Sequence, residues 1–364
     1  MGHGITGTDG MFTVRQAAWH DLGVVFEDYP DRAKAQEIAH PWEPLREDIF
    51  RHIPSYHSDA DGKRILDRVG GSIPMMGDDG EQVTEAKLLE GHYANVRSDN
   101  GAELGVVTDK YVTVSNGELW DIAEALEQSG GDVMYETGGS LRGGAQVWVL
   151  VRLQEPLEIK GDPRGETVPY FALQNSHDGS GSFRGQATMT RIVCMNTSHV
   201  SDMDARARGT EFTFRHTKNV GDRISQAQEA LTGWRQSIED WKVQQEHLIT
   251  VPVTDNGVQA FLEKFIPMPP EHLISDRVKL NIEADRSKWL AGYRSITGAG
   301  IENTAYGLVQ ASTEFANWAK KANSAESRFR RTFLSKDKIV ADSVMLALEA
   351  ANFDGINAGV SVDA

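Results

Sequence analysis

Cysteine is almost absent from this sequence, and no hydrophobic run is long enough to cross a bilayer. The only cysteine among the 364 residues is Cys194, so an intrachain disulfide is excluded and a reducing compartment fits. The opening MGHGITGTDG also lacks the charged-then-apolar pattern of a signal peptide. We therefore expect a cytoplasmic protein with no membrane partner.

Signatures of phosphate-loop, zinc and covalent chemistry are missing as well. The chain contains no GxxxxGK[ST], and dispersed histidines with one cysteine do not make a zinc set. Cys194 stands in the apolar run RIVCMNT, where a buried and unreactive thiol is the usual outcome. His177-Asp178 resembles an acid–base pair, but Asp178-Gly179 is a hairpin turn signal. The sequence offers no catalytic residue, no metal ligand and no cofactor, and it leaves open whether the protein is an enzyme.

Negative charge dominates the composition, with a formal net charge of -16 at pH 7. Over the whole chain this excess repels nucleic-acid phosphates. The charge is uneven, however: six basic residues stand against three acidic ones between Arg184 and Lys218, which makes +3. Between Lys320 and Lys338 seven basic residues stand against two acidic ones, which makes +5. Each segment is either an ordinary solvated face or part of a local basic groove, since salt screens charges over roughly 8 Å.

The order of elements predicts an α+β fold, with strands up to about residue 217 and helices afterwards. Asn100-Gly101 and Asp178-Gly179 each predict a hairpin, and Ser115–Glu118 is a capping box that predicts the start of a helix. A short helix is expected at 31–40, and GGSLRGG at 138–144 is expected to be a flexible loop. The expected strands are 92–97, 104–107, 133–136, 146–153, 170–174, 183–194 and 211–216.

A long helix is predicted between Gly221 and Pro252 because apolar residues recur there at three- and four-residue steps. Its seam consists of Ile224, Ala227, Leu231, Trp234, Ile238, Trp241, Gln245 and Leu248. This seam either packs across the sheet, which we favour, or forms a coiled-coil arm. Further helices are expected at 258–265, 277–293, 301–319 and 339–350. The fold predicted is therefore a curved antiparallel sheet with a long packed helix, followed by a helical C-terminal region.

The same pattern divides the chain into four regions. We expect a loop-rich N-terminal region at 1–80, where Pro, Gly and Asp are frequent, and an α+β core at 81–250. A helical region at 251–352 follows, and a flexible tail at 353–364.

Positive side chains accompany the last expected strands, in YFALQNSHDGSGSFRGQATMTRIVCMNTSH at 170–199 and GTEFTFRHT at 209–217. Arginine grips phosphate through its planar donor fork, so these strands suit a phosphate backbone better than bond cleavage. Nearby phenylalanines either stack on bases or belong to the core: Phe183, Phe212 and Phe214. The expected nucleic-acid-binding residues are Arg142 in the glycine-rich loop, Arg184, Arg191, Arg215 and Lys218 near the strands, and Arg328, Arg330 and Arg331.

Several longer motifs resemble one family. They are NSHDGSGSF and TRIVCMNT, the opening GITGTDGMFTVRQAAWHDLG, the segment YETGGSLRGGAQVWVLVRL and GTEFTFRHTKNV. Over nearly the whole chain they are similar to the Domain of Unknown Function 932 family, phage- and plasmid-like proteins of actinobacterial phages and plasmids. This resemblance implies a protein of a mobile element such as a phage, and it transfers no catalytic residues.

The order of a glycine-containing hairpin, antiparallel strands with arginines and one long helix resembles the single-strand annealing proteins of phage recombination. That resemblance implies a homo-oligomer that holds single-stranded DNA in a basic groove. We therefore expect a single-stranded DNA binding and annealing protein of phage or mobile-element recombination, in the cytoplasm of the host cell. Annealing needs no cofactor, since base pairing drives the product. The alternative is a phage structural or host-interaction protein that assembles through the long helix without binding nucleic acid; an uncharacterised hydrolase has least support.

Overall fold

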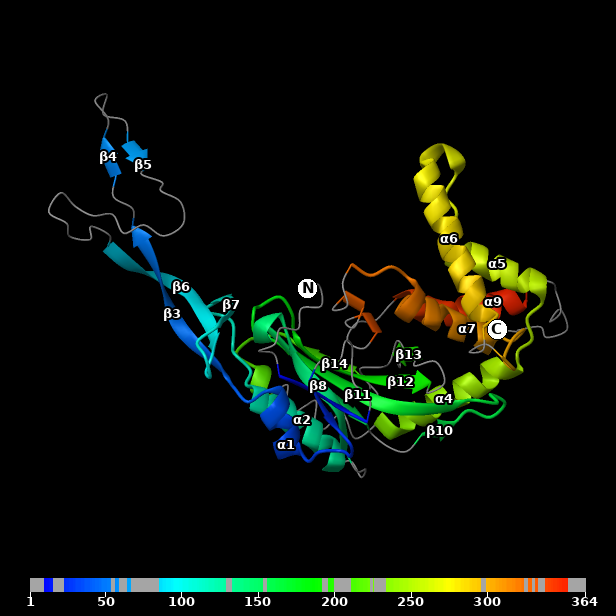
Figure 1. The fold of residues 1–364 in the computed structure, drawn as a ribbon, viewed down its shortest axis with the longest axis horizontal. Helices are drawn as coiled ribbons and strands as arrows, with labels where there is room; N and C mark the ends of the chain where they lie inside the picture. Colours follow the sequence, from blue (N-terminus) through cyan, green and yellow to red (C-terminus); the bar gives the residue numbers. More distant parts are fainter. Residues whose placement is uncertain are drawn as a thin grey trace.

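The computed structural model describes residues 10–15, 23–53, 56–58, 64–66, 85–128, 133–152, 156–191, 196–199, 211–222, 225, 234–295, 299–323, 327–328, 331–332 and 338–352. Figure 1 shows a large sheet in the middle, an arm of strands on one side and a group of helices on the other. The predicted α+β fold with a helical C-terminal region is confirmed.

The large sheet has the strand order β13-β12-β11-β9-β8-β1-β2, with β10 paired to β11 and β14 paired to β12. All its pairs are antiparallel except β1 with β2, which run parallel. The strands are β1 (Met11–Val14), β2 (Val24–Phe26), β8 (Met134–Leu141), β9 (Gln146–Arg152), β10 (Leu157–Glu158), β11 (Glu166–Ser176), β12 (Phe183–Arg191), β13 (Asn196–His199) and β14 (Glu211–Phe214). The hairpin predicted at Asp178-Gly179 is confirmed as the connection between β11 and β12.

The glycine-rich segment 138–144 is not a loop, contrary to expectation. Its first four residues extend β8 to Leu141, and only Arg142–Gly144 forms a turn. The reason is the close approach of β1: a Cβ at Gly138 would meet the Phe12 ring at 3.0 Å, and one at Gly139 would meet the Gly10 carbonyl oxygen at 2.9 Å. These glycines therefore allow strand pairing at a distance that other residues would prevent.

One face of the sheet is apolar and is covered by helices. The hydrophobic core on this face combines Phe171, Leu173 and Phe183 of the sheet with Trp120 and Ile122 of a helix. Because side chains alternate along a strand, every second residue of β9, β11 and β12 enters this core. The covering helices are α1 (Arg32–Ala39), α2 (Asn116–Gln128) and the first turns of α4 (Trp234–Thr250).

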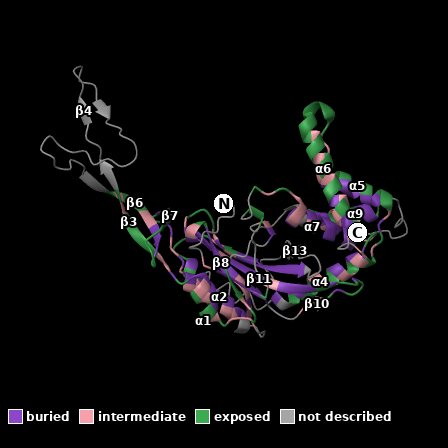
Figure 2. Cartoon of the chain, viewed as in Figure 1, coloured by how far each residue is buried: buried purple, intermediate pink, exposed green. Residues whose placement is uncertain are grey.

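The opposite face of the sheet carries polar and charged residues beside Trp148, Leu150 and Ala172, and we call it the polar face. Its residues form rows across β9, β11, β12 and β14, of which two are Trp148–Gln174–Arg184–Thr213 and Leu150–Ala172–Gln186–Glu211. Figure 2 shows the strands of the sheet buried, whereas much of the described arm and the protruding part of α6 are exposed. The strand predicted to be covered on both sides, β9, is buried throughout.

The arm is a three-stranded antiparallel sheet, β3 (Pro44–Ile53), β6 (Glu85–Arg97) and β7 (Glu103–Thr108), followed outward by the pair β4 (Tyr56–Ser58) and β5 (Arg64–Leu66). The hairpin predicted at Asn100-Gly101 is confirmed, with Gly101 at a φ of 67°. Strand β3 lies in the segment that we expected to be loop-rich. Strand β3 pairs along its length with β6, which is thirteen residues long, and this pairing holds β3 in the sheet.

The helical region has its own hydrophobic core, built from α5 (Asp255–Phe265), α6 (Asp276–Tyr293), α7 (Ala305–Glu314) with its π-helical continuation Phe315–Ala319, and α9 (Lys338–Ala351). Helix α4 connects this core to that of the sheet. Trp234 and Ile238 are buried in the sheet core, Leu248 is buried in the helical core, and Trp241 packs against both. The described residues of the predicted seam therefore pack against other parts of the same chain, as in the sheet-packed alternative.

Ile224, Ala227 and Leu231 lie outside the described residues, as does the predicted tail at 353–364. Within the part of the chain described above, no helix is both long and apolar enough to span a membrane.

Candidate nucleic-acid interface

Three connecting segments meet at one end of the large sheet, which we call the turn end. They are the β8–β9 turn at Arg142–Ala145, the β11–β12 loop at 177–182 and the segment 215–220 after β14. The register places them together, because Gln146 faces both Leu141 and Ser176 across the strands, and Phe183 faces Phe214. The base of the arm packs on this end: a Cβ at Gly105 would lie 2.6 Å from the Asp178 Cα atom.

Arg142 projects from the turn end into solvent and has a left-handed backbone. Its φ is 55°, in a region that non-glycine residues seldom occupy, and the two glycines after it also have positive φ. Burial raises the pKa of the Asp178 carboxyl, but hydrogen bonds from Ser176 and Ser180 and the charge of Arg142 outweigh it, so that this pKa lies below its ordinary value. The guanidinium of Arg142 thus lies within electrostatic reach of the β11–β12 loop.

Arg215 and Lys218 are exposed at the same end, and they are joined by a lysine that sequence reasoning missed. Tyr111 stacks on His216, with ring centroids 4.5 Å apart, and the Val112 N–H donates to the His216 carbonyl at 3.2 Å. The exposed Lys110, one position before Tyr111, is therefore near the segment 215–220, although about a hundred positions separate them in the sequence. Only the folded contact reveals this neighbour, since Lys110 follows an unremarkable turn in the sequence.

Arg184 does not lie on an open surface. Its guanidinium is 3.6 Å from the carboxylate of Glu211, and the two side chains are only 20% and 8% exposed. The prediction that Arg184 grips a phosphate from an open groove is therefore wrong in its geometry, because Glu211, in the next row of the sheet, competes for its charge. Phe183 and Phe212 are buried in the core and stack on each other, and Phe212 also stacks on the partly buried Phe214, so the rings of Phe183 and Phe212 are packing residues and are not available to bases.

The other predicted cations lie away from the turn end. Arg191 is at the far end of β12, where its backbone pairs with Thr167, and its side chain lies outside the described residues. Arg328 is exposed in the C-terminal part of the chain, while Arg331 donates from Nη2 to the Lys320 carbonyl at 3.0 Å. Arg330 lies outside the described residues. The predicted set is therefore divided among separate places, and the turn end brings together Arg142, Arg215 and Lys218, with Arg184 in the sheet beside them.

A pocket opens on the polar face next to these cations. Its volume is about 410 Å³, and it lies against the row Trp148–Gln174–Arg184–Thr213. Gln146 and Ser182 line its side toward the turn end, and Gln146 donates to the Ser180 hydroxyl at 3.3 Å. Arg184 and Glu211 supply one charge of each sign, so the lining is polar but close to neutral.

A buried hydrogen-bond network positions the turn end against the arm and α2. The Asn116 side chain donates to the Trp42 carbonyl at 2.7 Å and accepts from His177 Nε2 at 2.9 Å. The His177 backbone in turn donates to Ala145 of the β8–β9 turn at 2.8 Å and accepts from the Asn95 side chain of β6 at 2.7 Å. Arm, helix and both turns are thus joined through two residues.

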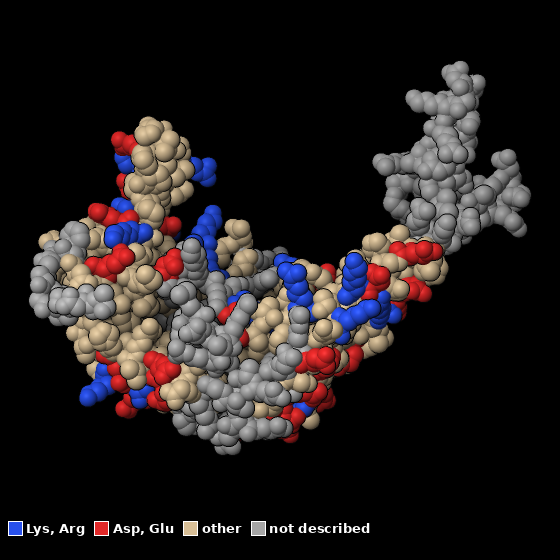
Figure 3. Space-filling view, turned by 180° about the vertical axis from the view of Figure 1, so that it is seen from behind, with Lys and Arg blue, Asp and Glu red and all other residues tan. Residues whose placement is uncertain are grey.

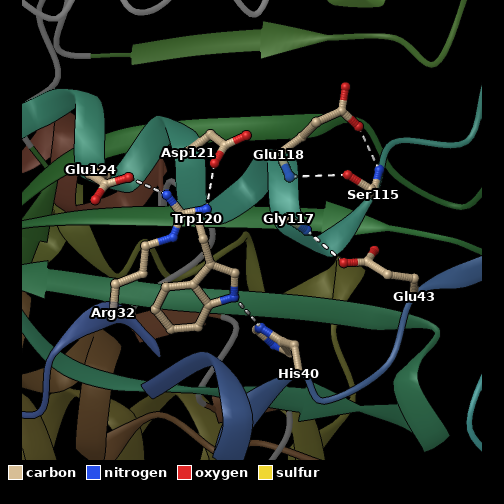
Figure 4. Close-up of polar contacts among 9 residues, drawn as sticks. All are labelled: Arg32, His40, Glu43, Ser115, Gly117, Glu118, Trp120, Asp121 and Glu124. Atoms are coloured by element: carbon tan, nitrogen blue, oxygen red, sulfur yellow. Dashed lines mark hydrogen bonds and ion pairs between the residues drawn. The ribbon is translucent and has the colours of Figure 1, made fainter. Parts of the chain in front are cut away.

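The first turn of α2 is capped twice. The predicted capping box is confirmed: the Glu118 N–H donates to the Ser115 hydroxyl at 3.1 Å, and the Glu118 carboxylate accepts from the Ser115 N–H at 2.7 Å. Glu43, at the entrance to the arm, accepts from the backbone of Asn116 and Gly117 at 2.6 and 3.0 Å. Figure 4 shows the capping box and the contact of Glu43 with Gly117, with Arg32 paired to acidic residues further along the helix. A carboxylate at a helix N-terminus is favourable because it meets free N–H groups and the positive end of the dipole.

The buried histidines around this network are neutral. Burial lowers the pKa of His40 to about 4, and burial together with the neighbouring His216 and His40 lowers that of His177 to about 3. His40 donates from Nε2 to the Gly139 carbonyl at 2.8 Å and accepts from Trp120 Nε1 at 3.1 Å, so its neutral form is fully satisfied. A proton on His177 Nδ1 would find no acceptor among the described residues. Within the same ranges no three His, Cys, Asp or Glu side chains gather to hold a metal ion.

The fold and the turn end define an α+β protein that has exposed cations and a polar pocket toward one end of its sheet, with an arm hydrogen-bonded to that end. The chain belongs to the family described as Domain of unknown function (DUF932), whose model matches residues 103–333. The match begins with β7 and includes Arg142, Arg184 and Arg215, so the turn end is part of the family's region. No curated protein and no solved structure matches the chain.

Acid should destabilise the protein through its buried histidines. Their folded pKa values lie below the ordinary 6.5, so their contribution to stability is complete above that pH and is lost as the pH falls toward about 4. We expect a loss on the order of 3 kcal/mol for each histidine in the free energy of unfolding, measured by urea denaturation between about pH 7.5 and about pH 4. His40→Gln, which keeps a donor and an acceptor, should reduce this pH dependence, whereas His92→Gln at an exposed site should leave it unchanged. An equal free energy of unfolding at both pH values would contradict the conclusion that these histidines are buried in their neutral form.

Loss of the Asn116 side chain should loosen the joint at the turn end. In Asn116→Ala the Trp42 carbonyl and the His177 Nε2–H both lose their buried partner. We expect a decrease of roughly 2–4 kcal/mol in the free energy of unfolding, because each unsatisfied buried group costs about 1–3 kcal/mol. Asn281→Ala, an exposed asparagine on α6, is the matched control and should change stability by less than about 0.5 kcal/mol. Similar effects for both variants would show that the network is dispensable.

Proposed function

We propose that this protein binds single-stranded DNA at the turn end and promotes the annealing of complementary strands. The observation that supports this is the grouping of exposed cations, Arg142, Arg215, Lys218 and Lys110, at one end of a sheet in a chain of net charge -16. Cations that serve solubility alone need no such grouping. The proposed setting is the recombination of a phage or another mobile element in the host cytoplasm.

Local charge decides whether an anionic protein holds an anionic strand. Salt screens charges over roughly 8 Å, so phosphates at the turn end respond mainly to the cations beside them. In Figure 3 several Lys and Arg side chains line the hollow between the arm and the helical region, whereas Asp and Glu crowd the lower edge beneath the base of the arm. This distribution supports a strand lying on the hollow side.

Oligomerisation is part of the proposal. The arm exposes apolar side chains that a second copy of the chain would cover, among them Leu45 (47%), Phe50 (58%) and Val106 (51%). In the proposal, the exposed Arg328 of the C-terminal region provides a second contact for the DNA strand. In the described part of the long helix, the seam residues Trp234, Ile238 and Leu248 are already buried within the chain, so these three are not open to a second copy.

Removal of the turn-end cations should weaken DNA binding in a salt-dependent manner. The test variant is Arg142→Asn/Arg215→Gln/Lys218→Gln, in which asparagine tolerates the left-handed backbone. At low salt we expect at least about a tenfold loss of affinity for a labelled single strand, and a decrease of about 2 in the slope of log affinity against log salt. Fluorescence anisotropy over a salt series measures both.

The control has the same change in net charge at exposed lysines on three helices: Lys34→Gln/Lys264→Gln/Lys288→Gln. It should bind nearly as well as the wild type. An equal loss in both triple variants would mean that only bulk charge matters, and an absence of binding at low salt would remove the proposal. Annealing is followed with two labelled complementary strands, which the wild type should pair faster than buffer alone.

A further inference from the structure

We infer that the pocket on the polar face of the sheet receives one unstacked nucleobase of the bound strand. This inference rests on the proposed function and gives the pocket a task different from that of the surrounding cations. The cations would contact the sugar–phosphate backbone, and the pocket would contact a base.

The chemistry of the lining favours a neutral, hydrogen-bonding ligand. Arg184 and Glu211 lie 3.6 Å apart and supply charges of opposite sign, so a phosphate entering the pocket would meet a carboxylate as well as a guanidinium. Gln146 and Gln174 line the pocket with amides, a group that carries both donors and acceptors, as the edges of bases do. A base is neutral, planar and polar at its edge, and therefore matches this set better than a phosphate does.

The size and the walls of the pocket also suit a base. Small-molecule sites usually enclose roughly 300–1,000 Å³, and the pocket, at about 410 Å³, lies at the lower end of that range. Trp148 occupies the same row of the sheet as Gln174 and contributes an aromatic wall. The hydroxyls of Ser182 and Thr213 complete the polar edge.

The neighbouring cations are placed to hold the backbone on either side of such a base. Arg215 is two positions after Thr213, which lines the pocket, and Arg142 acts electrostatically on Asp178, which accepts from the pocket residue Ser176 at 2.5 Å. A strand that crosses the turn end thus has phosphate contacts at the pocket rim and a place for one base between them.

The experiment compares a labelled single strand with an otherwise identical strand whose residues are abasic. Both carry the same phosphates, so contacts to the backbone alone predict equal affinity. If the pocket holds a base, the wild type should bind the abasic strand about 5- to 150-fold more weakly, since one base contact is worth about 1–3 kcal/mol. A 2-aminopurine placed in the normal strand should also change its fluorescence on binding, because it leaves the stack.

Two variants locate the effect. Gln174→Leu removes an amide, and Thr213→Phe fills the pocket from its exposed edge strand. Each should lose the preference for the base-containing strand while retaining affinity for the abasic one. Gln236→Leu, at an exposed site on α4, is the matched control and should keep the preference. Equal affinity of the wild type for both strands would overturn the pocket assignment while leaving the proposed DNA binding intact; binding of neither strand would overturn both.

Discussion

The geometry of the turn end depends on the buried hydrogen bonds that Asn116 and His177 share. Asn116 holds the chain that leads into the arm through the Trp42 carbonyl, and His177 holds the β8–β9 turn and the arm strand β6. A buried polar network tolerates little displacement, because each broken bond leaves a desolvated group. Gly105 and Asp178 accordingly approach so closely that no side chain fits between them. The arm is thus fixed to the sheet by polar bonds as well as by packing.

The alternation of side chains along the strands determines where cations can function. In the first part of β12 the residues that face the helices are apolar, so Phe183 and Ala187 enter the core, whereas Arg184 lies on the opposite face. On that face a buried charge needs a partner, which Glu211 provides for Arg184. Cations exposed to solvent therefore remain mainly where strands end and turns begin, as at Arg142. The basic surface is a cluster at one end of the sheet, in place of the continuous groove expected along the strands.

Features that depend on a few neighbouring residues could be predicted from the sequence, whereas contacts between distant segments could not. Ser115–Glu118 and Asp178-Gly179 carry their structural signals within four residues or fewer, so the cap and the hairpin were found. The pairing of Arg184 with Glu211 needs the register of β12 with β14, which no local pattern contains. Likewise Gly138 was interpreted as a loop residue because its reason for being glycine is the Phe12 ring of a strand far away in sequence. The sequence therefore indicated which residue types to consider, but it did not predict how these residues are arranged in space.

In the function that we propose, the combination of rim cations and a neutral pocket would distinguish between forms of DNA. A duplex keeps its bases stacked inside and bends smoothly only over about 50 nm, so it can present phosphates to Arg142 and Arg215 but no free base to Gln174. A single strand presents both at once and follows a short, curved surface at small cost. The acidic remainder of the chain adds repulsion that grows with the number of phosphates brought near it, and that number is larger for the rigid duplex. Such a surface would release its product once two strands have paired, which is the behaviour that annealing requires.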